Sequence, residues 1–295
     1  MDEHGVDYML LSLTSPGCQG ESDPVAARTM ARDANDYLAA EVGKNPARFG
    51  ALAALSMHDP AEAAGELRRA GGGAGDVWGA EGDGKIYYDT AEYDEFWATV
   101  QELDVPIYFH PRYRIKQDLA PETRYGSRKH LVGAGVSFHL DLSWHVYAVL
   151  SSGMLDRYPG VKLVVGHLGE GIPFNLWRAS HWINHPFKKD VRPCKQDYRY
   201  YFTHNVFITT SGFFSTPGLK FCINEIGLER CLYSIGNGYL HHIASSRELK
   251  FYADTPYENV KEGQDWWKSV DLPENEKEAV GRRNAIRLFK LPLED

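Results

Sequence analysis

The sequence lacks the features of a membrane, secreted or nucleic-acid-binding protein. No run of 18 apolar residues occurs, so no transmembrane helix is expected. The acidic start "MDEHGVDYML" does not contain the apolar core of a signal peptide. The net charge of −8 argues against nucleic acid or an anionic membrane as the main partner. We therefore expect neither kind of partner.

Cysteine is scarce, and a dinucleotide-binding motif is missing. Cys18, Cys194, Cys222 and Cys231 are scattered without C-x-x-C spacing, which is typical of reduced structural cysteines and predicts a cytoplasmic protein. No G-x-G-x-x-G follows an apolar run. The composition that is present, with 43% hydrophobic and 13% aromatic residues, is sufficient for a core and for a pocket that takes a flat ligand.

Apolar runs alternate with amphipathic stretches along the chain, and this pattern predicts repeated βα units around a parallel sheet. The sequence predicts a (β/α) barrel in one domain, residues 1–295, with a doubly wound open sheet as the alternative. The glycine-rich residues 71–85 contain no strand pattern, although the alternation requires a strand there. The expected strands are 8–13, 49–57, 105–110, 161–170, 205–212 and 231–235, and the expected helices are 23–46, 59–70, 90–104, 137–159 and 275–291.

Two histidines end apolar strand patterns. His110 closes "VPIYFH" and His167 closes "VKLVVGH". Each histidine alone is equally compatible with a buried ring that bonds to the backbone. In a barrel, however, the carboxyl ends of the strands converge, and two imidazoles there can hold a divalent metal or transfer protons. The coincidence of two such positions favours a functional site.

Two charged residues follow these histidines. Arg112 can bind a substrate carboxylate through its planar guanidinium, or it is an ordinary surface arginine. Glu170 either orients His167 by accepting a hydrogen bond from its ring or caps the following segment.

The last part of the chain offers a carboxylate and a histidine pair. Asp254 in "DTPYE" can ligate a metal or act as an acid or base, although Asp-Thr-Pro is also an ordinary turn. The neighbours His241 and His242 rank low as a metal site, because adjacent side chains point in different directions on a helix or a strand.

Four stretches together resemble a known family. They are "VPIYFHPR", "VVGHLGEGIPFNLWR", "NVFITTSGFFSTPGLKFCINEIGLERCLYSI" and "DTPYE". The resemblance is to the metal-dependent decarboxylases of the amidohydrolase superfamily that act on 2,3-dihydroxybenzoate (o-pyrocatechuate), γ-resorcylate or salicylate, and it covers nearly the whole chain. It implies a distorted (β/α)8 TIM barrel of the metal-dependent hydrolase type, a homodimer or homotetramer, and one divalent metal ion, either zinc, manganese or magnesium.

The resemblance also implies roles for single residues. His110, His167 and Asp254 match metal ligands. His167 further matches a proton-handling group, and Asp254 matches the acid that protonates the ring carbon before CO2 leaves. Arg112 and Glu170 keep the roles given above. The implied substrate is a small aromatic carboxylic acid, and the implied products are a phenol or catechol and CO2. The alternatives are a lactone or amide hydrolase of the same superfamily and an inactive, truncated or mis-spliced homologue.

The chain departs from the family pattern at three places. The family starts with a strand carrying Glu-x-His, whereas Met1–His4 does not match it, so we expect an incomplete barrel that lacks its first strand. The glycine-rich residues 71–85 stand where the family has a strand. Gly236 to Ala253, 18 residues, separate Ile235 from Asp254, which the family joins directly.

The third departure leads to a prediction about the gene. Removal of residues 236–253 restores the family pattern "LYSIDTPYE", so we interpret this segment as a retained intron or an error in the assigned gene structure. Sequencing of the spliced transcript should show that these 18 codons are missing. Detection of a peptide from the natural protein that spans residues 236–253 would contradict this interpretation.

Overall fold

The structure is a computed structural model that describes residues 1–13, 17–71, 75–78, 87–111, 119–235 and 260–294. Four of the expectations above fall outside these residues. They concern Arg112, the segment 236–253, the pair His241 and His242, and Asp254.

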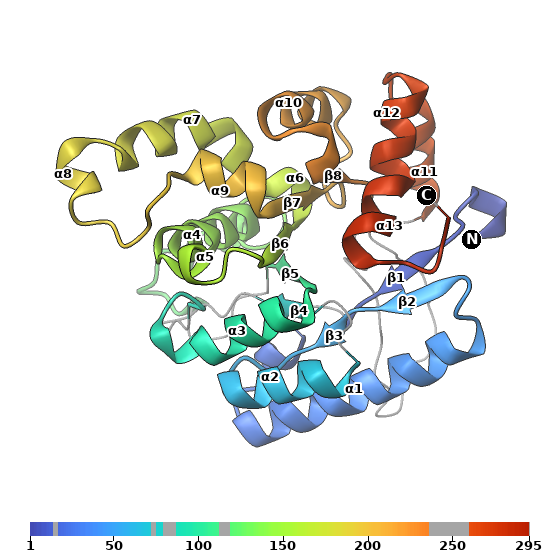
Figure 1. Ribbon diagram of the computed structural model, residues 1–295, viewed down its shortest axis with the longest axis horizontal. Helices are drawn as coiled ribbons and strands as arrows, with labels where there is room; N and C mark the ends of the chain where they lie inside the picture. Colours follow the sequence, from blue (N-terminus) through green and yellow to red (C-terminus); the bar gives the residue numbers. More distant parts are fainter. Residues whose placement is uncertain (14–16, 72–74, 79–86, 112–118, 236–259, 295) are drawn as a thin grey trace.

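All described strands run parallel and follow one another in chain order (Figure 1). Leu52 alone separates β2 from β3, so one extended run of chain passes from a two-stranded sheet into a six-stranded sheet. The expected α/β architecture with parallel strands is confirmed. The first sheet contains β1 (Met9–Leu11) and β2 (Phe49–Ala51), and the second contains β3 (Ala53–Ala54), β4 (Gly75–Trp78), β5 (Pro106–His110), β6 (Lys162–Val165), β7 (Val206–Thr209) and β8 (Cys231–Leu232).

Helices lie between the strands and on the outside of the sheets (Figure 1). Within the described residues, no helix is both long and apolar enough to cross a bilayer. The helices are α1 (Pro24–Lys44), α2 (Pro60–Arg69), α3 (Asp94–Leu103), α4 (Ser137–Ser151), α5 (Met154–Arg157), α6 (Gly166–Glu170), α7 (Ile172–Ile183), α8 (Pro186–Lys189), α9 (Tyr198–His204), α10 (Thr216–Ile226), α11 (Val260–Ser269), α12 (Glu274–Glu278) and α13 (Asn284–Phe289).

The first two long helices begin where Asp-Pro pairs predict. The Asp23 carboxylate accepts a hydrogen bond from the Val25 amide at 2.8 Å, and Pro24 occupies the first turn of α1. Asp59 caps α2 in the same way and accepts from the Ala61 amide at 2.9 Å. An aspartate at this position satisfies backbone donors that have no partner within the helix, and proline needs none.

The glycine-rich region contains a strand, so the expectation that a strand is replaced at residues 71–85 is wrong for its described part. Strand β4 lies between β3 and β5 and pairs with both. A Cβ atom on Gly75 would lie 2.8 Å from the Cδ1 atoms of both Leu55 and Ile107. Glycine is therefore required for the close packing of this strand, and the same glycine weakens its strand pattern in the sequence.

The strand order has a seam between β1 and β8, which do not pair within the described residues. Strand β1 uses Met9 and Leu11 to bond to β2, so the backbone of Leu10 faces away from β2. At the outer edge of β8, the Tyr233 amide donates to the Val280 carbonyl at 2.8 Å. The Asn284 side chain donates to the Cys231 carbonyl at 2.9 Å. Segments of the C-terminal helices thus cover the edge of β8.

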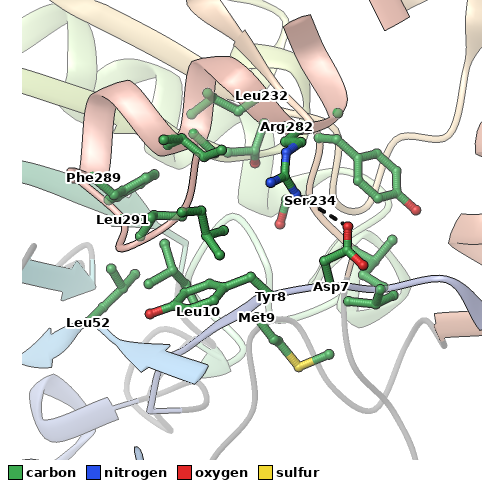
Figure 2. Close-up of a pocket in the computed structure, with 18 of the residues that line it drawn as sticks. Asp7, Tyr8, Met9, Leu10, Leu52, Leu232, Ser234, Arg282, Phe289 and Leu291 are labelled. Atoms are coloured by element: carbon green, nitrogen blue, oxygen red, sulfur yellow. Dashed lines mark hydrogen bonds and ion pairs between the residues drawn. The ribbon is translucent and has the colours of Figure 1, made fainter. Parts of the chain in front are cut away.

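A cavity of about 250 Å³ lies along this seam (Figure 2). Its walls combine apolar side chains of β1, β8 and α13, among them Leu10, Leu232 and Phe289. An ion pair between Asp7 and Arg282, at 3.3 Å, crosses one end of it. Among the described residues, side chains of β1, β8 and α13 therefore line the space between β1 and β8.

His145 of α4 is fully buried in an aromatic environment, with ring contacts to Tyr87, Tyr88 and Phe109. Its Nε2 accepts a hydrogen bond from the Tyr88 amide at 3.2 Å. Its Nδ1–H has no partner among the described residues. Burial lowers the pKa of His145 to about 3, because the charged ring would lose its hydration.

This buried ring should make stability depend on pH. The unfolded chain binds a proton at His145 below about pH 6.5, whereas the folded protein does so only near pH 3. The buried ring therefore does not lower the free energy of unfolding above the unfolded pKa. Below that pKa, the free energy of unfolding falls by up to about 1.4 kcal/mol per pH unit. In urea unfolding, the free energy of unfolding should fall less between pH 7 and pH 5 for His145→Gln than for the unchanged chain. The exposed His204→Gln variant should behave like the unchanged chain, and equal slopes for all three proteins would contradict this assignment.

Candidate active site

His110 is the last residue of β5, and its side chain is buried. Its Nδ1 lies 2.6 Å from the Pro111 carbonyl oxygen. Because a carbonyl only accepts, Nδ1 carries the proton and donates. In the neutral ring the lone pair is therefore on Nε2, the arrangement of a histidine that serves as a metal ligand or a proton acceptor.

His167 lies in an unusual turn directly after β6. The residues from His167 to Gly171 all have positive φ angles, and three of them are not glycine: His167 (53°), Leu168 (51°) and Glu170 (56°). A left-handed conformation costs about 1–2 kcal/mol for each residue with a Cβ atom. Such strain persists only where the surroundings enforce it, and it is concentrated at functional sites.

The contacts of this left-handed turn explain how it is maintained. The buried Glu170 places Oε1 2.5 Å from His167 Nδ1, so the carboxylate accepts the ring proton and fixes the lone pair on Nε2. This contact supports the first of the two alternatives for Glu170, in which its carboxylate orients the His167 ring. Leu168 is buried, and a Cβ on Gly169 would lie within 3.1 Å of both Ile208 and Pro173.

The two histidines come together, as the strand-end pattern predicts. Strands β5 and β6 are neighbours, and the His110 and His167 ring centroids are 5.2 Å apart at 67°. Both rings have Nδ1 engaged, so both carry the lone pair on Nε2. Two imidazoles are fewer ligands than a divalent metal requires, and the described residues contain no group of three or more potential metal ligands.

Three hydroxyl groups lie beside the histidines, and the sequence did not predict them as part of the site. Tyr108 Oη lies 3.0 Å from Thr209 Oγ1, which in turn lies 3.2 Å from Ser211 Oγ. Tyr108 reaches β7 across β6 because a Cβ on Gly166 would lie only 3.2 Å from its hydroxyl. One signal in the sequence was available: Tyr108 is two residues before His110, so both lie on the same face of β5.

The cavity of the seam reaches this region. Tyr108, His110 and Thr209 belong to its wall, together with the apolar residues named above. An apolar cavity of roughly 150 Å³ can hold benzene. The observed cavity of about 250 Å³ therefore has room for a single aromatic ring with small substituents.

Three of the four buried cysteines are poorly suited to act as nucleophiles. Burial raises the pKa of Cys222 to about 12 and that of Cys231 well above its usual value. The pKa of Cys194 is also raised, mainly by burial. A thiol that stays protonated at neutral pH is unreactive, so the chemistry of the site rests on its histidines, carboxylates and hydroxyls.

Parallel strands in chain order, with two histidines at adjacent carboxyl ends, are compatible with a barrel enzyme that holds a metal ion at this face. The amidohydrolase family model matches residues 1–291, and the chain belongs to this family. Among solved structures, 2,6-dihydroxybenzoate decarboxylase from Rhizobium is 38% identical, with a TM-score of 0.86 over 99% of this chain and 86% of that one. The resemblance found in the sequence is thereby confirmed.

Further relatives are also named as decarboxylases of hydroxybenzoic acids. γ-Resorcylate decarboxylase of Polaromonas sp. is 38% identical over 99% of this chain and 85% of its own length. A Polaromonas dihydroxybenzoic acid decarboxylase, solved with bound manganese and the inhibitor 2-nitroresorcinol, is 37% identical, with a TM-score of 0.86 over 100% of this chain and 85% of that one.

Two glycines allow a matched test of how His167 is positioned. Gly171 and Gly212 have φ angles of 74° and 66°, so alanine is strained at both. A Cβ at Gly171 would meet nothing within 4 Å, whereas one at Gly212 would collide with the His167 ring. In urea unfolding, Gly171→Ala should cost about 1 kcal/mol. Gly212→Ala should cost about 1–3 kcal/mol more, because the ring must move. Equal losses would show that the ring does not pack on Gly212.

Proposed function

We propose that this chain carries out the nonoxidative, metal-dependent decarboxylation of a hydroxybenzoic acid of the dihydroxybenzoate type, giving a phenol or catechol and CO2. The observation that carries the proposal is the His110–His167 pair at adjacent strand ends, with Glu170 bonded to His167. It occurs in a chain 38% identical to γ-resorcylate decarboxylase over 99% of its length. The cavity that His110 lines has room for one aromatic ring.

His110, His167 and Asp254 would hold one divalent ion, either zinc, manganese or magnesium. Two Nε2 lone pairs and a carboxylate fit such an ion, since imidazole and carboxylate are ligands common to zinc and manganese sites. When bound, the ion acts as a Lewis acid that fixes the substrate carboxylate and the neighbouring phenolic oxygen. Arg112 supplies a second cation for the carboxylate.

The chemical step is a proton transfer to carbon. The carboxyl group of Asp254 donates its proton to the ring carbon that carries the carboxylate, and a hydroxyl group on the ring supplies electron density to that carbon. The bond from this carbon to the carboxylate then breaks, its electron pair restores the aromatic ring, and CO2 leaves. A proton from solvent then returns to the ionised Asp254, because the Nε2 lone pair of His167 would be used on the ion and its Nδ1 proton is held by Glu170. Such positioned proton donors accelerate reactions about 10²–10⁴-fold.

We further infer the organisation of the protein around this site. Residues 1–295 form a single barrel domain, in which β1 and β8 do not pair within the described residues. The chain assembles as a homodimer or homotetramer. The four cysteines, all buried and free, support a cytoplasmic location.

The test is turnover by the purified chain. CO2 release from 2,6- and 2,3-dihydroxybenzoate should require added Mn²⁺ and stop with a chelator. Glu170→Gln should lower kcat about 10²-fold or more, because a neutral amide no longer anchors the His167 ring as strongly. The exposed variant Glu62→Gln on α2 serves as the control and should keep full activity. Ring opening of an aromatic lactone without CO2 release would favour the hydrolase of the same superfamily.

The seam favours a second candidate, an inactive barrel that assembles with complete copies. A barrel that lacks a strand exposes the edges of the neighbouring strands and offers fewer metal ligands, which weakens both folding and metal binding. On this candidate the chain expressed alone is poorly soluble or inactive, and it gains no activity with Mn²⁺. Robust metal-dependent turnover by the chain alone would exclude it.

A further inference from the structure

One large apolar side chain is exposed directly after a strand, at the face of the sheet that carries the candidate active site. Phe213 is 47% exposed and lies in the segment that joins β7 to α10. The other exposed large apolar side chains of the described residues lie on helices, except Val191, which lies between α8 and α9. In a barrel, the segments that follow the strands surround the active site. Phe213 is therefore exposed on the side from which a ligand would enter.

The backbone places Phe213 next to a residue that contacts the His167 ring. Gly212 precedes Phe213, and a Cβ atom on Gly212 would collide with that ring. Consecutive Cα atoms are about 3.8 Å apart, so the Phe213 side chain begins one residue away from this contact. The Phe213 amide donates to the Thr210 carbonyl at 3.1 Å and closes a turn at the end of β7. The exposed ring thus starts from a backbone position beside the candidate active site.

Contacts on both sides hold this turn in place. Before it, the Thr210 hydroxyl donates to the Ser234 carbonyl at 2.8 Å and accepts from the Ser234 amide at 3.0 Å, which joins the end of β7 to the end of β8. After it, the Phe214 ring stacks on Trp266 of α11 with ring centroids 5.1 Å apart at 21°. The backbone of Phe213 is therefore fixed before a ligand binds, which reduces the entropy lost on binding.

The two adjacent phenylalanines have different surroundings. Phe214 is half-buried, and its stacking on Trp266 explains why an aromatic ring is needed there. Phe213 makes no ring contact with the described residues, so packing within this part of the chain does not explain its ring. Pockets that bind small molecules are lined largely by apolar and aromatic side chains. An aromatic side chain at this position is suited to cover one face of a flat ligand.

We propose that the Phe213 ring stacks on the aromatic ring of an acid bound at the His110–His167 pair, and so selects flat ligands over puckered ones of the same size and charge. The inference rests on the proposed function, because it takes the aromatic acid named there as the ligand. Offset or edge-to-face contact between two aromatic rings is favourable beyond the area that it buries. Phe213 is in this view a substrate-binding residue and takes no part in proton transfer.

The experiment is titration calorimetry of the full chain, in the presence of Mn²⁺, with benzoate and with cyclohexanecarboxylate. Both probes carry one carboxylate on a six-membered ring, and neither has the hydroxyl group that the proposed decarboxylation needs. Phe213→Ala should weaken benzoate binding about tenfold, because apolar contact and stacking are both lost. Phe213→Leu should weaken benzoate binding about two- to tenfold and leave cyclohexanecarboxylate binding nearly unchanged, because it keeps an apolar side chain but removes the ring. The matched control is Tyr37→Ala, which removes a similarly exposed ring (49%) on α1 and should change neither affinity.

Because Phe213 is exposed, both variants should keep the urea midpoint of the unchanged chain. No saturable benzoate binding by the unchanged chain would overturn the proposal, as would equal benzoate affinities for the unchanged chain and Phe213→Ala. Equal losses for the two probes in Phe213→Leu would also overturn it. A lower sedimentation coefficient for Phe213→Ala with unchanged benzoate binding would assign the ring to a contact between copies instead. A chain that binds benzoate through Phe213 but releases no CO2 from dihydroxybenzoates would support this inference and contradict the decarboxylation.

Discussion

The hydrogen bond between Glu170 and His167 is the interaction on which the site depends. It joins the two ends of a left-handed turn whose three residues with side chains together cost about 3–6 kcal/mol of backbone strain. The bond cannot offset that cost alone, since a bond to a charged group contributes about 1.5–3 kcal/mol. Burial of Leu168 and close packing of Gly169 on Ile208 supply the rest, so the turn is enforced by the packing of β6 and β7.

The same turn determines where α7 begins. Gly171, its last residue, is also the residue before the first turn of α7, so the helix leaves the barrel at an angle fixed by the His167 geometry. Only the left-handed residues His167 to Gly171 thus separate the ring at the site from the first turn of α7.

The sequence predicts those parts of the structure that depend on local pattern. Helix starts at Asp-Pro pairs can be predicted from the sequence, and so can the two histidines at strand ends, because each feature depends on only a few neighbouring residues. Strand β4 is not visible, since Gly75 is chosen for its contacts with Leu55 and Ile107. The left-handed angles at His167 and Leu168 oppose local preference and follow only from tertiary packing. The hydroxyl cluster likewise requires that a Tyr108 side chain pass over Gly166 to a strand that is not its neighbour.

The contacts that fix the strands around the seam are different from the contacts that complete the candidate site. The cavity between β1 and β8 is walled partly by Tyr108 and His110, so this cavity and the candidate site share a boundary. Side chains of α13 such as Phe289 keep this cavity apolar, and Tyr233 and Asn284 hold the edge of β8 against the C-terminal helices. These contacts fix the edge of β8 among the described residues. Whether the site is complete is decided separately, by the ligands that join His110 and His167, because two imidazoles alone do not hold a divalent ion firmly.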